Sequence, residues 1–203
     1  MAKEGFPFVI IPAIAALLLG YLGLWWVAIA FALLAMFMAY FFRDPHRVTP
    51  EGEGLIVSAA DGKVTRIEET QTGKVVSVFL SPLDVHINRS PISGTVEKIA
   101  YIAGKKMPAT SNTASLLNER NSLTITNGEL TVVCTQIAGI LARRIVCWAK
   151  EGDALTRGER FGLIKFSSRT DLLMPKSVEI AVGIGDKVVG GETIIARAIV
   201  AES

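Results

Sequence analysis

The feature that most constrains this chain is one long apolar segment near its start. Residues 5–42 contain no charged side chain. The segment is too long for the core helix of a soluble protein and for the apolar centre of a signal peptide. Gly20 and Gly23 interrupt it, close to aromatic side chains of the kind that favour the membrane–water boundary. We therefore expect two apolar helices, over residues 6–20 and 24–42, joined by a short turn.

These two helices indicate a membrane anchor over residues 1–48. The second is long enough to cross a bilayer at about 1.5 Å per residue, whereas the first is short, contains Pro12 and could dip in without crossing. A hairpin would place both ends on one side of the membrane, and Lys3, Arg43 and Arg47 identify that side as cytoplasmic. The alternatives are one tilted span, or a helix pair lying in the interface.

The composition excludes several classes of protein. A net charge of +2, with 21 Lys and Arg against 19 Asp and Glu, excludes a strongly basic nucleic-acid-binding protein. An apolar content of 50% excludes a disordered chain. Two cysteines, Cys134 and Cys147, are too few for a disulfide framework. Two histidines are too few for a His-rich zinc site, so no metal is expected.

Residues 49–203 are predicted to form a mainly β domain, because short apolar runs alternate there with glycine turns. A weak helical pattern occurs only around 113–120. One internal repeat is visible, in which two Gly-acid pairs recur 33 residues later: Gly152-Asp153 and Gly158-Glu159, then Gly185-Asp186 and Gly191-Glu192. Such turns resemble those of lipoyl- and biotinyl-type β-sandwiches, so we expect a barrel-sandwich-like domain preceded by a hydrophobic helical hairpin.

Asp61, His86 and Ser168 are the residues from which a catalytic site could be built. Each lies near the end of a predicted strand, and Ser167 stands beside Ser168. Taken singly, Asp61 reads as a turn residue, His86 as a structural histidine and the serines as the end of a strand. Taken together, they are the ingredients of a proton relay that activates a nucleophile. The residues alone therefore indicate a membrane-anchored β protein with a candidate nucleophilic serine.

A series of motifs runs through almost the whole chain in a fixed order. They are KEGFPF, FFRDPHR, EGEGLIVSAADGKV, FLSPLDVHINRSPISGTV, NERNS, QIAGILARRIVCW, EGD, RFGLIKFSSRTDLLMP and GDKVVGGETIIAR. So many ordered motifs are far more specific than any single one. Through them the chain resembles the short bacterial and archaeal type of phosphatidylserine decarboxylase proenzyme, a pyruvoyl-dependent carboxy-lyase.

The resemblance implies a covalent cofactor made from the chain itself. Such proenzymes cut themselves before a serine, here Ser168, so the broken bond is Ser167–Ser168 and the products are chains 1–167 and 168–203. The new amino terminus becomes a pyruvoyl group, so no added cofactor is needed. Its carbonyl forms a Schiff base with the amine of phosphatidylserine, and loss of CO₂ gives phosphatidylethanolamine.

The resemblance also implies partners and a location. The substrate is phosphatidylserine in the cell membrane, with the catalytic domain on the cytoplasmic side. The large and small chains of one proenzyme stay together, no nucleic acid takes part, and a homo-oligomer is left open. Without a glycine-rich phosphate loop, the lipid phosphate needs fixed cations, for which Arg120, Arg143 and Arg144 are candidates. The alternative is that these arginines are surface or ion-pair residues.

Two positions depart from the pattern of the family. Ser167 stands where the family has glycine, whose backbone freedom helps a hydroxyl to reach the carbonyl that precedes it. Arg89 stands where longer members have a second histidine, which in them is tied to self-cleavage. His86 is therefore expected to serve decarboxylation, cleavage or both.

Two other functions stay open on the residues alone. One is a membrane-anchored biotinyl- or lipoyl-like binding module, for which the only Lys-Met pair is Lys106-Met107. The other is a serine hydrolase using Ser168, although no Gly-x-Ser-x-Gly elbow surrounds that serine. Both of these predict an intact chain, whereas the decarboxylase predicts a cut one.

Overall fold

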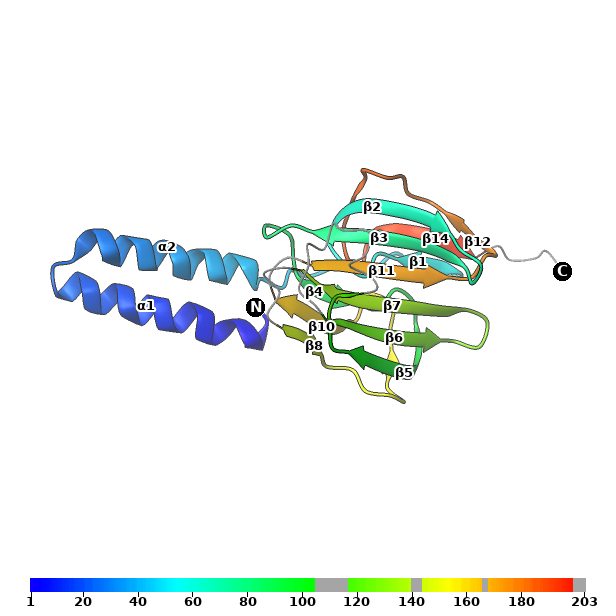
Figure 1. The fold of residues 1–203 in the computed structure, drawn as a ribbon, viewed down its shortest axis with the longest axis horizontal. Coiled ribbons are helices and arrows are strands. Elements are labelled where there is room, and N and C mark those ends of the chain that lie inside the picture. The colour runs from blue at the N-terminus through cyan, green and yellow to red at the C-terminus, as the bar shows by residue number, and fades with distance from the viewer. Residues whose placement is uncertain (105–116, 140–143, 166–167, 199–203) are drawn as a thin grey trace. The chain divides into compact units, whose positions relative to one another are not determined.

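The computed structural model describes residues 1–104, 117–139, 144–165 and 168–198. The chain divides into two compact units, Met1–His46 and Arg47–Ser203. The described part of the first unit is helical, and the described part of the second is built mainly from strands (Figure 1).

The first unit is a hairpin of two apolar helices, as the sequence predicts. A short 3-10 turn, η1 (Lys3–Gly5), leads into α1 (Phe6–Tyr21), and α2 (Trp25–Phe41) returns beside it (Figure 1). The connecting turn contains Gly23 at a φ of 79°, a backbone conformation that glycine adopts without strain.

Small side chains let the two helices approach each other. A Cβ added to Gly20 of α1 would lie 3.8 Å from the Cβ of Ala28, which is buried in α2. At the other end of the hairpin, the N–H of Ala2 donates to the carbonyl of Phe42 at 2.9 Å. The ring of Phe8 stacks on that of Phe42 with 5.5 Å between their centroids.

The outer surface of this hairpin is apolar, which supports association with a membrane. Its exposed side chains include Ile11, Leu17, Leu18, Tyr21, Trp26 and Leu33. The helical run Lys3–Tyr21 has 19 residues and is long and apolar enough to cross a bilayer, whereas α2 has 17. The sequence analysis expected the second helix to be the spanning one. The difference lies in the helix bounds, because η1 extends the first helical run at its start and α2 is one residue shorter at each end than the expected range 24–42.

The second unit contains one large and two small antiparallel sheets in its described residues. The large sheet has eight strands: β13 (Lys187–Val188), β2 (Gly62–Glu69), β3 (Lys74–Leu80), β11 (Ser168–Met174), β7 (Thr131–Ala138), β6 (Arg120–Thr126), β5 (Gly94–Ile102) and β9 (Ala154–Leu155), in spatial order. One small sheet has the order β1 (Leu55–Val57), β14 (Ile194–Ala198) and β12 (Val178–Ile180). The other has the order β4 (Ile87–Arg89), β10 (Arg160–Lys165) and β8 (Arg144–Cys147).

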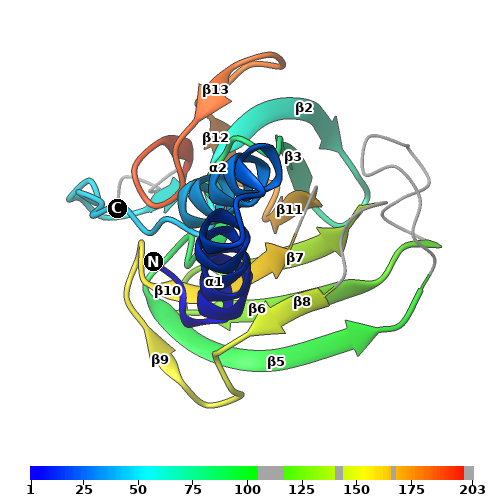
Figure 2. The ribbon, with the colours of Figure 1, turned by 90° about the vertical axis from the view of Figure 1, so that its left-hand side faces the viewer.

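The large sheet curls into a half-barrel that runs from β13 at one edge to β9 at the other (Figure 2). This mainly β architecture agrees with the predicted fold class. The weak helical pattern around 113–120 falls mainly outside the described residues, and β6 already begins at Arg120.

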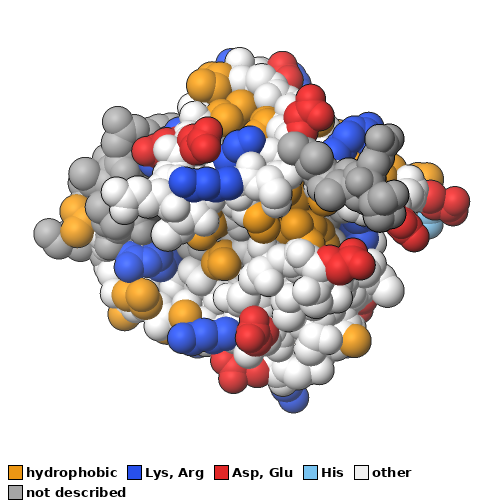
Figure 3. Space-filling view, turned by 90° about the vertical axis from the view of Figure 1, so that its right-hand side faces the viewer, with side chains coloured by type: hydrophobic (Ala, Val, Ile, Leu, Met, Phe, Trp, Pro, Cys, Tyr) orange, Lys and Arg blue, Asp and Glu red, His pale blue; other side chains and the backbone are white. Residues whose placement is uncertain are grey.

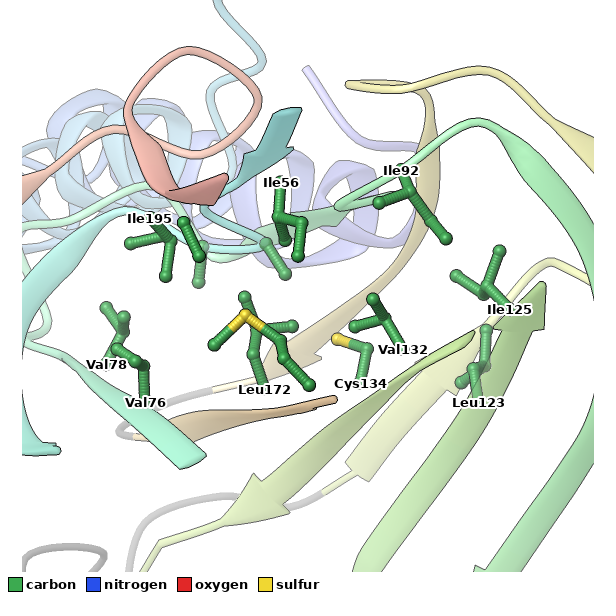
Figure 4. Close-up of a cluster of buried hydrophobic side chains, with 14 of the residues drawn as sticks. Ile56, Val76, Val78, Ile92, Leu123, Ile125, Val132, Cys134, Leu172 and Ile195 are labelled. Atoms are coloured by element: carbon green, nitrogen blue, oxygen red, sulfur yellow. The ribbon is translucent and has the colours of Figure 1, made fainter. Parts of the chain in front are cut away.

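The apolar core lies on the inner face of this half-barrel, where it meets the β1–β14 pair (Figure 4). Side chains of a strand alternate between its two faces, so every second residue points inward. On β11, Leu172 and Met174 belong to the core, which places Ser168 and Thr170 on the same inner face. The inward residues of the neighbouring strands are Val76, Val78 and Leu80 on β3, and Val132 and Cys134 on β7.

The internal repeat forms a pair of equivalent turns, as its sequence predicts. Gly152 and Gly185 have φ angles of 90° and 102°, and their N–H groups donate to the carbonyls of Val96 and Val64, each at 2.8 Å. The carboxylates of Asp153 and Asp186 cap these turns through backbone N–H groups at 2.8 Å.

A second repeat accompanies the first and escaped the sequence analysis. Residues 58–64, SAADGKV, and residues 90–96, SPISGTV, make matching contacts. The hydroxyl of Ser58 donates to the carbonyl of Ala60 at 2.6 Å, and that of Ser90 donates to the carbonyl of Ile92 at 2.7 Å. The β unit is therefore built from two similar halves.

Charged side chains of both signs are interspersed around apolar ones on the face of the β unit in Figure 3. This mixture fits the near balance of acidic and basic residues in the chain. Among the residues that the structure describes, no extended patch of one sign occurs on that face.

Candidate active site

Ser168 is the first residue of β11, between Leu80 of β3 and Ala138 of β7. Because these strands are antiparallel, the start of β11 and the ends of β3 and β7 lie at the same end of the sheet (Figure 1). The strand ends form one edge of the sheet there. Ser168 is fully buried, and its Oγ has no hydrogen-bond partner among the residues that the structure describes. A buried hydroxyl without a partner costs stability, so such a group marks a candidate for chemistry.

His86 lies directly before β4 and is also buried. Its Nδ1 is 2.9 Å from the carbonyl oxygen of Asp84. A carbonyl only accepts hydrogen bonds, so Nδ1 must carry the proton, and the neutral ring then has its lone pair on Nε2. A lone pair on Nε2 is what a general base needs.

Two routes through the fold bring His86 to the edge of the sheet where Ser168 lies. In the first, Ala138, opposite Ser168, packs against Ile164, and the N–H of Ile164 donates to the carbonyl of His86 at 3.2 Å. In the second, Leu80 is opposite Ser168 and the turn that ends at His86 follows it. The structure thus brings Ser168 and His86 to one region.

That turn is held by Asp84. Its carboxylate accepts hydrogen bonds from the N–H and the hydroxyl of Ser81, at 2.8 and 2.6 Å. The N–H of Asp84 in turn donates to the carbonyl of Ser81 at 3.0 Å. The Asp84 carbonyl that orients the ring of His86 is therefore fixed within a closed turn.

Asp61 stands beside this region and is engaged elsewhere. Its Oδ1 accepts the N–H of Gly190 at 2.8 Å, and its Oδ2 pairs with Arg47 at 2.7 Å. Burial raises the pKa of the Asp61 carboxyl, the hydrogen bond from Gly190 and the charge of Arg47 lower it, and the charge of Asp84 raises it. Asp61 is thus close enough to Asp84 for their charges to interact.

The arginine candidates lie on strands next to the same edge. Arg120 begins β6 opposite Ile137, the neighbour of Ala138, and is half-buried. Arg144 begins β8 opposite Lys165 and is exposed. Arg143, Ser167 and the Lys106-Met107 pair lie outside the described residues.

Arg89 has a contact that its place in the sequence did not indicate. Its side chain is buried, and one guanidinium nitrogen donates to the carbonyl of Gly158 at 3.0 Å. Gly158 belongs to one of the repeated turns, with a φ of 82°. This contact ties β4 to that turn.

Buried polar side chains near the site were missed by the sequence analysis. Asn88, Gln136 and Thr170 are each at most 1% exposed, and Asn88 is hydrogen-bonded to both of the others. The available signal was limited to Gln136, which shares the inward face of β7 with apolar side chains, since β4 and β11 carry further polar residues beside Asn88 and Thr170. In the described residues, no cluster of three or more His, Cys, Asp or Glu side chains is placed to hold a metal ion.

The fold and this edge of the sheet define a mainly β protein with an apolar N-terminal hairpin, and with a buried serine and a buried histidine in one region of its β unit. A family profile described as phosphatidylserine decarboxylase matches residues 34–196. The chain belongs to the phosphatidylserine decarboxylase family.

Relatives agree over nearly the full length. A protein of Syntrophus aciditrophicus is 45% identical over 202 residues, covering 95% of each chain. One from Nitratidesulfovibrio vulgaris is 45% identical over 206 residues, covering 97% of this chain and 94% of its own. One from Symbiobacterium thermophilum is also 45% identical over 206 residues, covering 97% and 95%. All three are named phosphatidylserine decarboxylase proenzyme.

Proposed function

We propose that this chain is a proenzyme that cuts itself between Ser167 and Ser168 and then converts phosphatidylserine to phosphatidylethanolamine with the pyruvoyl group so formed. The observation that carries the proposal is the Oγ of Ser168, which is buried and has no hydrogen-bond partner among the described residues. The name proenzyme, which the relatives bear, is in line with a chain that must be processed.

The self-cleavage uses residues of the chain alone. His86 takes the proton of the Ser168 hydroxyl at Nε2, and Oγ attacks the carbonyl carbon of Ser167. The peptide C–N bond breaks, an ester forms, and the nitrogen of Ser168 is released as an amine. Loss of the α-proton of Ser168 then breaks its Cβ–Oγ bond, and Oγ leaves as part of the new carboxylate of Ser167. Water finally replaces the nitrogen, which leaves as ammonia, and a carbonyl remains at the start of the small chain.

The surroundings of Ser168 fit a small, uncharged group of this kind. Leu80, Ala138 and Ile164 are fully buried and supply apolar contacts around that edge of the sheet. When present, a pyruvoyl group supplies a carbonyl that reacts with the substrate amine and accepts the electrons released with CO₂. The apolar side chains limit the access of bulk water to that carbonyl, and His86 can hold or return a proton at Nε2.

Asp61 supports this site electrostatically in our proposal. Its carboxylate fixes Arg47 and lies within electrostatic reach of Asp84, whose carbonyl orients His86. Arg120 and Arg144 are the described cations proposed to receive the lipid phosphate, together with Arg143.

The apolar hairpin gives this chemistry its location. The substrate is a lipid whose head group lies at the membrane surface, so an anchored enzyme meets it at a high local concentration. Lys3, Arg43 and Arg47 flank the hairpin and favour a catalytic unit on the cytoplasmic side.

The test uses the full chain with vesicles of phosphatidylserine in phosphatidylcholine, and measures formation of phosphatidylethanolamine. Ser168→Ala should stay uncut and form no product. Ser77→Ala is the matched control, because Ser77 is also fully buried and its Oγ also has no hydrogen-bond partner among the described residues. It should be cut and active. Loss of activity in both variants, or in neither, would count against Ser168 as the source of the cofactor.

Labelling with a serine-reactive probe distinguishes the proposed decarboxylase from a serine hydrolase. A serine hydrolase would stay intact and react with a fluorophosphonate at Ser168. We expect no such label, because Ser168 is consumed by cleavage in the active enzyme.

A further inference from the structure

Asn88 joins the strand that follows His86 to the strand that begins with Ser168. Its Nδ2 donates to the hydroxyl of Thr170 at 3.0 Å and to the carbonyl of Ala59 at 3.3 Å. Its Oδ1 accepts from Nε2 of Gln136 at 2.9 Å. Both hydrogens of Nδ2 are therefore used. The side-chain amide of Asn88 has one orientation that satisfies these partners.

The positions of Asn88 and Thr170 relate them directly to the candidate site. Asn88 is two residues after His86, and Thr170 is two residues after Ser168. In an extended chain, residues two apart point to the same side, separated by about 7 Å. The hydrogen bond between Asn88 and Thr170 therefore lies two residues after His86 on one segment and two residues after Ser168 on the other.

The pairing of β7 and β10 shows that His86 and Ser168 lie on the same side of this hydrogen bond. Gln136 is opposite Thr170, and Ala138 is opposite Ser168. On β10, Gly162 is opposite Asn88, while the N–H of Ile164 donates to the carbonyl of His86. Since Ile164 packs against Ala138, moving from Asn88 to His86 leads toward Ser168.

The network around this bond is buried and continues away from the site. Oε1 of Gln136 accepts from Nδ2 of Asn121 at 3.0 Å, and Asn88, Gln136, Thr170 and Asn121 are 0 to 3% exposed. A buried polar network that satisfies its members is rigid, because any shift leaves a group unpaired. Gly162 makes room for it, since a Cβ there would lie 3.0 Å from Nε2 of Gln136.

We propose that Asn88 and Thr170 are positioning residues, whose hydrogen bond sets the place of His86 relative to Ser168 for self-cleavage. The inference rests on the proposed function. Neither residue reacts; the bond holds the base and the nucleophile in register, where a displacement of about 1 Å can cost on the order of a hundredfold in rate.

The test compares three variants of the full chain, expressed as the uncut precursor and followed by the rate of self-cleavage. Thr170→Val keeps the shape of the side chain and removes the acceptor, so cleavage should slow at least about tenfold. Thr170→Ser restores the hydroxyl and should cleave within about threefold of wild type. Thr135→Val is the matched control, because it removes a threonine hydroxyl that is 2.9 Å from Ser122 on the opposite face of the sheet. It should cleave like wild type.

A second readout separates positioning from folding. Each variant is also melted, and cleavage is measured at a temperature at which all of them are folded. Thr170→Val should lose more thermal stability than Thr135→Val, because it leaves Nδ2 of the buried Asn88 with one partner fewer. If Thr170→Val does not fold, Thr170→Ala replaces it, with the same expectation. Cleavage of the folded Thr170 variant at the wild-type rate, or equal slowing in Thr170→Ser, would overturn the inference. A wild-type chain that never cleaves would instead overturn the proposed function, so the two failures are distinguishable.

Discussion

Asp61 and Ser93 occupy equivalent positions in the two halves of the β unit. Oδ1 of Asp61 accepts the N–H of Gly190 at 2.8 Å, and Oγ of Ser93 accepts the N–H of Arg157 at 2.9 Å. A hydroxyl is therefore enough for the backbone contact. Asp61 has a second carboxylate oxygen that Ser93 lacks, and this oxygen pairs with Arg47 at 2.7 Å.

This equivalence makes Asp61→Ser an informative change. The serine retains the acceptor for Gly190 and removes the partner of Arg47, whereas Asp61→Val removes both. We expect Asp61→Ser to lower the free energy of unfolding by about 1–3 kcal/mol, and Asp61→Val by more, since a buried N–H then stays unpaired. Chemical denaturation measures both values. If Asp61→Val were the more stable of the two, the proposed equivalence with Ser93 would be wrong.

The carboxyl of Asp61 should also make the free energy of unfolding depend on pH. Burial raises its pKa above the ordinary 3.8, outweighing the hydrogen bond from Gly190 and the charge of Arg47. A raised folded-state pKa means that the folded chain binds the proton more tightly, so this contribution to stability is present below the ordinary pKa and lost as the pH rises through the raised value. The free energy of unfolding of the wild type minus that of Asp61→Asn should therefore fall with rising pH and then level off. A difference that rises instead would mean that Arg47 dominates.

Both thiols should be unreactive in the folded chain. Cys134 is fully buried, and Cys147 is half-buried with its Sγ 3.5 Å from the carbonyl of Ala149. Burial raises the pKa of each thiol, which reduces the fraction of reactive thiolate. A disulfide reagent at mildly alkaline pH should label neither thiol before unfolding and both after it. Rapid labelling of the folded chain would show that one of these strands opens.

Gly162 should tolerate no side chain. A Cβ there would overlap the carbonyl oxygen of Val146 and press on Gln136, so Gly162→Ala should cost about 3 kcal/mol or more. Gly128→Ala is the control, because Gly128 has a φ of 92° and nothing within 4 Å of an added Cβ. Only backbone strain of about 1–2 kcal/mol is expected there. Equal losses of unfolding free energy in the two variants would contradict the crowding around Gln136.

Much of the fold could be predicted because its signals are local. The uncharged run of residues 5–42 specifies the helical hairpin, and the Gly-Asp pairs at 152 and 185 specify two turns. The expected first helix, residues 6–20, agrees closely with α1 (Phe6–Tyr21), and only the short 3-10 turn Lys3–Gly5 before it was not anticipated.

The candidate site was less accessible from the sequence because its contacts are not local. Asn88 and Thr170 are 82 positions apart, and nothing in either segment specifies their hydrogen bond. Likewise, the sequence suggested a relay of Asp61, His86 and Ser168, and it did not indicate the Asp84 carbonyl that lies 2.9 Å from Nδ1 of His86. A carbonyl acceptor belongs to every residue, so no side-chain pattern could indicate it.

Self-cleavage at Ser168 is tested most directly by the intact mass of the purified chain under denaturing conditions, with Ser168→Ala as the control. We predict two species, residues 1–167 and a 168–203 fragment lighter than its sequence by one ammonia, while Ser168→Ala stays whole. The Ser167→Gly variant should cleave at least as fast as the wild type, because glycine relaxes the backbone before the attacked bond. A single full-length mass for both the wild type and Ser167→Gly would contradict the pyruvoyl enzyme.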